Sequence, residues 1–125
     1  MSKGYILVVE DHQLLLEAIQ DLLQVNGYEV AMANNGFAAL DAIKKRPPDL
    51  ILSDITMPQM DGYDLYQKVR ENPSWVRIPF IFLTARGERT DVLRGKALGV
   101  EDYIVKPFDT EVGLINALTR TARRV

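Results

Sequence analysis

The sequence contains no cysteine, and this absence removes several kinds of chemistry. Without a thiol, the chain of 125 residues can form no disulfide, no thiolate metal site and no cysteine nucleophile. The absence also fits a reducing compartment. Its apolar runs are far shorter than the roughly 20 residues that span a bilayer, and two acids interrupt the N-terminal stretch before a signal peptide could develop. We therefore expect a cytoplasmic protein with no membrane contact.

The sequence also lacks an excess of either charge. It carries 15 Lys and Arg residues against 17 Asp and Glu residues, for a formal net charge of -2. This balance gives no electrostatic reason to expect direct binding of nucleic acid or of an anionic membrane. Hydrophobic residues make up 47% and charged residues 26% of the chain, which argues against disorder. We expect residues 1–125 to form one globular domain, with no second domain in this chain.

Short apolar runs alternate with helical stripes five times along the chain. The predicted strands are residues 5–9, 29–33, 50–53, 80–83 and 103–105. The predicted helices carry the apolar stripes within residues 15–23, 37–43, 65–69, 92–98 and 112–122. Strands without polar alternation are buried on both faces, so the pattern predicts an α/β protein with a parallel sheet between two layers of helices. Ligands of such sheets bind beyond the carboxyl ends of the strands.

Polar residues follow four of the five predicted strands. They are Glu10 and Asp11 after the first, Asp54 after the third, Thr84 after the fourth and Lys106 after the fifth. Neighbouring parallel strands lie about 4.8 Å apart, so these side chains are within reach of one another. Grouped carboxylates repel unless a cation joins them, and hard oxygen ligands favour Mg²⁺ over zinc or copper. A lysine and a hydroxyl suit a phosphoryl group. The pattern predicts metal-assisted phosphoryl transfer with a carboxylate as the nucleophile.

Four motifs together resemble those of one family. They are the acidic pair at residues 10–11, SDITMPQMDG at residues 53–62, the Thr-Ala pair at residues 84–85 and Lys-Pro-Phe at residues 106–108. In this order they resemble the receiver domain of two-component response regulators, the family of the chemotaxis receiver, over essentially the whole chain. The resemblance implies a (βα)₅ flavodoxin-like, doubly wound parallel sheet with the strand order 2-1-3-4-5.

The resemblance also implies a role for each site residue. Asp54 would accept a phosphoryl group from the phosphohistidine of a sensor histidine kinase or of a phosphotransfer protein. Glu10, Asp11, Asp54 and the backbone carbonyl of Thr56 would hold Mg²⁺, with Mn²⁺ as an alternative. Lys106 would pair with a phosphoryl oxygen. The chain would then be a signalling domain that assists its own phosphorylation and dephosphorylation, rather than an enzyme in the ordinary sense.

In this family phosphorylation is reported by a distant face. The Thr84 hydroxyl would move to the phosphoryl group and Tyr103 would turn inwards, which would reshape the face formed by the fourth helix, the fifth strand and the last helix. That face is expected to support homodimers on phosphorylation, through Arg89, Asp91, Arg94, Asp102 and Arg120. Thr56 and Arg86 would flank the water that attacks the acyl phosphate and would tune the lifetime of this group. The identities of the two residues do not indicate whether they lengthen or shorten it.

Two other functional classes compete with this interpretation. An aspartyl-phosphate phosphatase or mutase resembles a pattern with a second aspartate two residues after the nucleophile, where this chain has Thr56. A receiver-like binding module that is never phosphorylated typically loses the acids, the acceptor or the lysine, and this chain has all of them. We interpret His12 as a solvated residue at the start of the first helix, and Trp75 as local packing in a loop.

Overall fold

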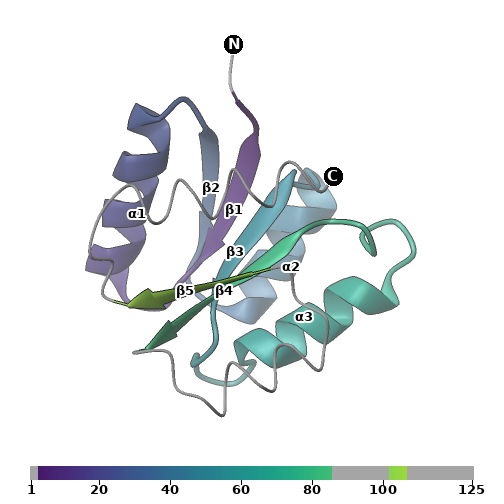
Figure 1. Cartoon of the computed structure of the whole chain (residues 1–125). Helices are drawn as coiled ribbons and strands as arrows, with labels where there is room; N and C mark the ends of the chain where they lie inside the picture. Colours follow the sequence, from purple (N-terminus) through teal and green to yellow (C-terminus); the bar gives the residue numbers. More distant parts are fainter. Residues whose placement is uncertain (1–2, 86–101, 107–125) are drawn as a thin grey trace.

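Five parallel strands form one sheet in the order β2-β1-β3-β4-β5 (Figure 1). The computed structural model describes residues 3–85 and 102–106, and the side chains of residues 3–83. The strands are β1 Tyr5–Val9, β2 Glu29–Ala33, β3 Leu50–Asp54, β4 Phe80–Ala85 and β5 Asp102–Lys106. Both the parallel sheet and its strand order agree with the prediction.

Helices cover the two faces of this sheet. The described helices are α1 Gln13–Val25, α2 Gly36–Lys45 and α3 Gly62–Glu71. Figure 1 shows α1 on one side of the sheet and α2 with α3 on the other. The helices predicted within residues 92–98 and 112–122 lie outside the described residues. Over the described part of the chain, no helix has the length and apolar character needed to cross a bilayer.

Alternate residues of β1, β3 and β4 contribute to two separate apolar layers. In β1, Leu7 and Val9 belong to the cluster that α2 and α3 cover, whereas Ile6 and Val8 belong to the cluster under α1. All four side chains are almost completely buried. Burial on both faces explains why the strands read as continuous apolar runs, and it confirms the predicted two-layered packing.

Side-chain caps fix where the helices near the strand ends begin. Asp61 and Asp64 form a capping box, in which the backbone N–H of Asp64 donates to Asp61 at 2.9 Å and the N–H of Asp61 donates back at 3.3 Å. The Asn35 side chain accepts the N–H of Ala38 at 2.8 Å at the start of α2. Such caps satisfy N–H groups that have no partner within the helix. His12 is exposed at the N-cap of α1, as predicted, and its side chain makes no capping bond.

An aromatic cluster joins α3 to β4. The ring of Tyr63 meets that of Phe82 at a centroid distance of 5.1 Å, and Tyr66 meets Phe80 at 5.2 Å, both edge to face. Edge-to-face pairs add to the stabilisation from burial alone. Trp75, in the loop before β4, is 9% exposed and joins this apolar layer, so the prediction that its ring packs locally is confirmed.

Candidate functional site

The point where the chain changes direction across the sheet lies between β1 and β3. The chain leaves β1 for α1 on one face and leaves β3 for α3 on the other, and at such a point doubly wound sheets form their ligand-binding crevice, beyond the carboxyl ends of the two strands. Val9 pairs with Ser53 in the parallel register, which places the next residues, Glu10 and Asp54, side by side. The sheet topology therefore brings the predicted acids together.

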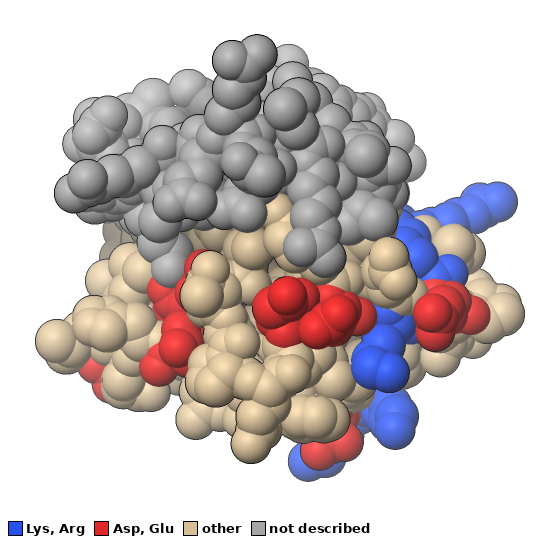
Figure 2. All heavy atoms as spheres, turned by 90° about the horizontal axis from the view of Figure 1, so that it is seen from below, with Lys and Arg blue, Asp and Glu red and all other residues tan. Residues whose placement is uncertain are grey.

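The side chains of three acids converge in this crevice. Glu10, Asp11 and Asp54 each offer a carboxylate oxygen, and these oxygens lie within 4.8 Å of one another. Glu10 has no exposed surface and Asp54 is 7% exposed, whereas Asp11 is exposed. Figure 2 views the molecule from the side to which the carboxyl ends of the strands point, and it shows acidic patches among mostly uncharged surface. A ligand would therefore enter from the side of Asp11.

The chemistry of this cluster fits Mg²⁺. Its ligands are three carboxylates, and Mg²⁺ binds hard oxygen ligands while keeping several waters. The longer side chain of Glu10 folds back, so that its Oε2 accepts the backbone N–H of Asp11 at 3.1 Å. This bond fixes one oxygen of Glu10 beside Asp11. The three acids predicted as metal ligands thus lie close enough together that they could hold a metal ion.

Backbone hydrogen bonds hold both acids in the sheet. The N–H of Glu10 donates to the carbonyl of Ala33 at 3.0 Å, which extends the pairing of β1 with β2. The N–H of Ile55 donates to the carbonyl of Leu83 at 3.2 Å, which continues the pairing of β3 with β4 past Asp54. The acidic residues are thus attached to a rigid part of the molecule.

The loop after Asp54 makes a tight, strained turn. The N–H of Met60 donates to the carbonyl of Pro58 at 2.8 Å, and Gln59 between them has a φ of 68°. This pattern is a classic γ-turn, a rare conformation for a residue other than glycine. The sequence gives no local sign of this strain, because neither proline nor glycine occupies position 59.

Gly62 closes this loop against the end of β3. Its N–H donates to the carbonyl of Ile55 at 2.7 Å. A Cβ at this position would overlap the carbonyl oxygen of Asp54 and would lie 2.8 Å from the Cα of Ile55. The start of α3 therefore approaches the backbone of Asp54 so closely that only glycine fits. The sequence signal for this contact is the glycine that ends the motif at residues 53–62.

The other predicted site residues are placed by the backbone alone or lie outside the described residues. Thr56 is exposed in the loop two residues after Asp54. Thr84 pairs with Val105, and Ala85 with Lys106, so Thr84 and Lys106 lie near the carboxyl ends of β4 and β5. Tyr103 pairs with Phe82 in the same ladder. Arg86 lies outside the described part of the chain.

Fold and carboxylate cluster together define a doubly wound α/β protein with an acidic site at its topological switch point. The family model for the response regulator receiver domain matches residues 6–118. This chain belongs to that family. The resemblance inferred from the four motifs is therefore confirmed.

Individual relatives agree with this assignment. The chain is 43% identical over 115 residues to the probable transcriptional regulator ycf29 of Porphyra purpurea, covering 90% of this chain and 55% of that protein. It is 38% identical over 120 residues to the phosphate regulon transcriptional regulatory protein PhoB of Rhizobium meliloti, covering 94% of this chain and 53% of that protein. The chain thus spans about half the length of these relatives.

A solved structure shares the fold over nearly its whole length. Chemotaxis protein CheY4 of Vibrio cholerae superposes with a TM-score of 0.88 at 32% identity, covering 94% of this chain and 98% of that one. The chain is accordingly a receiver domain of two-component systems, a signalling domain rather than a conventional enzyme.

Proposed function

We propose that Asp54 is the phosphoacceptor of this receiver domain and that the domain receives its phosphoryl group from the phosphohistidine of a sensor kinase or phosphotransfer protein. The observation that carries the proposal is the meeting of Glu10, Asp11 and Asp54, whose carboxylate oxygens lie within 4.8 Å of one another. Family membership supports it, because receiver domains use such a site.

Glu10, Asp11 and Asp54 would hold Mg²⁺ together with the backbone carbonyl of Thr56. When bound, the metal would neutralise charge between the acids and the incoming phosphoryl oxygens. The carboxylate cluster fits this role because two of its members are buried on a rigid sheet, while Asp11 stays exposed. We propose Mg²⁺ as the physiological ion and Mn²⁺ as a functional substitute.

Asp54 acts as the nucleophile of this reaction. One of its carboxylate oxygens forms a bond to phosphorus as the bond from phosphorus to the donor's imidazole nitrogen breaks. The imidazole leaves neutral because its other ring nitrogen carries a proton. Fixed backbone around Asp54 keeps the attacking oxygen in line, which is a large part of what a protein contributes to phosphoryl transfer.

Three further residues would bind and report the phosphoryl group. The Lys106 ammonium pairs with one phosphoryl oxygen, and the Thr84 hydroxyl donates to another. Tyr103 then turns inwards, and the equilibrium between two conformations of the face around β5 shifts towards one of them. A homodimer through this face is the proposed output for the phosphorylated domain.

The lifetime of the acyl phosphate is proposed to depend on Thr56 and Arg86. These residues lie two positions after Asp54 and Thr84 in the sequence, where they would flank the attacking water. Thr56 is exposed, so its side chain can be exchanged without disturbing the core. Exchanging either residue should change the dephosphorylation rate more than the phosphorylation rate.

Intact-protein mass spectrometry tests the central proposal. Incubation with acetyl phosphate and Mg²⁺ should add the mass of one phosphoryl group, and chelation of the metal should abolish the gain. The variant Asp54→Ala should show no gain. Asp41→Ala serves as the matched control, because Asp41 is an exposed aspartate on α2 and should leave the gain unchanged. A gain that survives Asp54→Ala would refute the assignment of the acceptor.

A further inference from the structure

A surface hollow between α2, α3 and the loop before β4 lies apart from the carboxylate cluster. It measures about 460 Å³ and is open to solvent. Lys44 lies in the last turn of α2 and Lys68 in the last turn of α3. Helices that connect parallel strands run antiparallel to those strands, so these last turns lie towards the amino ends of the strands. The hollow is therefore remote from Asp54.

The apolar part of the hollow is rigid. Trp75 is 9% exposed and belongs to the apolar layer under α2 and α3, and the partly buried Leu40 packs against the same layer. Backbone bonds hold the tryptophan in place: its N–H donates to Asn72 at 2.9 Å, and its carbonyl accepts from Ile78 at 3.0 Å. A fixed aromatic side chain beside an aliphatic one forms a preorganised anchor for an apolar group of a partner.

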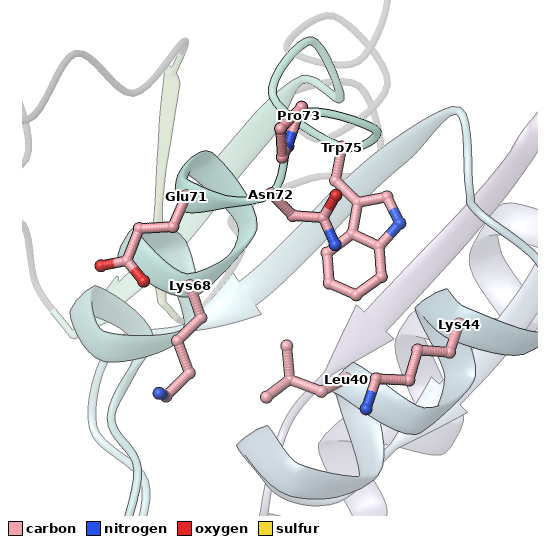
Figure 3. Close-up of a pocket in the computed structure, with 7 residues that line it drawn as sticks. All are labelled: Leu40, Lys44, Lys68, Glu71, Asn72, Pro73 and Trp75. Carbon is pink, nitrogen blue, oxygen red and sulfur yellow. The ribbon is translucent and has the colours of Figure 1, made fainter.

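The rim of the hollow carries a net positive charge, because Lys44 and Lys68 outnumber Glu71 among its lining residues. Lys44 and Lys68 are both exposed, and each comes from a different helix. Within the described residues neither lysine forms an ion pair, the ion pair found there being Arg46 with Glu29. Figure 3 shows the two lysine side chains extending on either side of Leu40, whereas Glu71, which also lines the hollow, carries its carboxylate on the Lys68 side, away from Leu40 and Trp75. The rim is thus complementary to a partner with negative charge.

We propose that this hollow docks an acidic peptide segment of a partner protein. The segment would place an apolar side chain against Leu40 and Trp75 and carboxylates beside Lys44 and Lys68. An open hollow suits such a segment better than a small molecule, because small-molecule sites enclose most of the ligand surface. Since the hollow is remote from Asp54, it would allow a partner to bind without covering the phosphorylation site.

Trp75 makes the proposal directly measurable, because it is the only tryptophan of the chain. The probe is an acetylated, amidated hexapeptide with two leucines between two pairs of glutamates, titrated while tryptophan emission is recorded. A peptide with lysines in place of the glutamates is the charge control. The acidic peptide should produce a saturable change in emission, and the basic peptide should produce none.

Charge reversal locates the binding. Lys44→Glu and Lys68→Glu should each weaken binding of the acidic peptide by about tenfold, as expected for a cation next to a carboxylate. Lys45→Glu is the matched control: Lys45 is exposed on the same helix but does not line the hollow, so binding should stay nearly unchanged. Thermal unfolding of each variant checks that the fold is intact.

Three results would overturn the proposal. The first is that tryptophan emission shows no saturable change up to millimolar acidic peptide. The second is that the basic peptide binds as tightly as the acidic one. The third is that Lys45→Glu weakens binding as much as Lys44→Glu and Lys68→Glu do, which would indicate attraction to the whole surface. Leu40→Ala gives an independent arm: it should weaken the leucine peptide and leave a peptide with serines in place of the leucines unchanged. Equal effects on both peptides would also refute apolar docking.

Discussion

Two neighbouring regions of the sheet bury opposite kinds of side chain. One is the face of β4 that packs on α3, and the other is the carboxyl end of the adjacent strand β3. Phe80 and Phe82 are fully buried and pack edge to face with the tyrosines of α3. At the end of β3, Asp54 is almost as buried, and Glu10 beside it has no exposed surface. Apolar burial stabilises the fold, whereas burial of carboxyl groups costs free energy unless they are compensated. The apolar packing of β4 on α3 therefore stabilises a fold that also holds two buried carboxyl groups.

Backbone conformation follows the same division. The described strands have regular parallel pairing. In the loop after Asp54, by contrast, Gln59 has a φ of 68° and Gly62 packs directly on the backbone of Asp54. Strained conformations persist where the surrounding structure imposes them, and they concentrate at functional sites. The contrast predicts that substitutions in the aromatic face affect stability most, while substitutions at the strand end affect function most.

Truncation of the aromatic face should have the largest effect on stability. Phe82→Ala removes a fully buried ring that meets Tyr63 and Phe80, so we expect a loss of about 3–5 kcal/mol in the free energy of unfolding. Urea unfolding measures this loss. Phe37→Ala is the control, because Phe37 is 53% exposed and its truncation should change stability by less than about 0.5 kcal/mol. Comparable losses in the two variants would contradict the proposed role of this face.

A methyl group at Gly62 tests the strain at the strand end. Gly62→Ala should destabilise the protein by about 1–3 kcal/mol, because the new Cβ meets backbone of Asp54 that cannot move freely. Gly36→Ala is the comparison variant: its Cβ would lie 2.6 Å from the Sδ, 2.8 Å from the Cγ and 2.9 Å from the Cβ of Met60, so the whole Met60 side chain must shift, but no backbone atom is among these contacts and we expect a smaller loss. Chemical denaturation measures which of the two variants loses more stability. Phosphorylation by acetyl phosphate should be slower in Gly62→Ala and unchanged in Gly36→Ala. A larger loss of stability in Gly36→Ala than in Gly62→Ala would show that the backbone of Asp54 moves easily.

This contrast also explains what the sequence could predict. The strands β1, β3 and β4 were predictable because apolar residues on both faces leave uninterrupted runs, as Leu50 to Leu52 illustrate. The acids were predictable because parallel strands bring their carboxyl ends to one edge, which required only that Glu10 and Asp54 follow strands. Both signals depend on periodicity and order, which the sequence carries directly.

The missed features depend on distances between segments. That Gly62 touches the backbone of Asp54, and that Gly36 touches Met60, follows from how closely the helices approach the loop. No local pattern encodes that approach. The γ-turn at Gln59 was missed for a similar reason, since the surrounding packing and not the residue's own preference imposes its positive φ.

Removal of one acid tests whether the site costs stability. Asp11→Asn should stabilise the metal-free protein by about 1 kcal/mol, because it relieves repulsion among carboxylates whose oxygens lie within 4.8 Å. Added Mg²⁺ should raise the unfolding temperature of the natural protein and much less that of the variant. Thermal unfolding with and without Mg²⁺ measures both. Asp41→Asn, at an exposed position on α2, should change neither the unfolding temperature nor its increase with Mg²⁺. A loss of stability in Asp11→Asn would argue against repulsion among the three carboxylates.

The smallest effect is expected at the opposite end of the sheet, where charges are paired and solvated. Arg46 donates to Glu29 at 2.8 Å, and the two side chains are 58% and 50% exposed. This hydrogen bond raises the pKa of Arg46 above its ordinary value, but the guanidinium is charged at any accessible pH with or without it. Arg46 also stacks on Tyr5, 3.8 Å from the ring centroid, and this contact does not need Glu29.

Glu29→Gln should therefore leave the midpoint of urea unfolding unchanged at physiological salt, with a small loss only at low ionic strength. Arg46→Ala removes the stacking on Tyr5 as well and should lower the midpoint measurably. A loss in Glu29→Gln that persists at high salt would mean that this exposed pair contributes more than screening allows. Charged side chains would then stabilise the amino end of the sheet strongly. In that case apolar packing would not be the main source of stability, and the contrast between the aromatic face and the charged strand ends would fail.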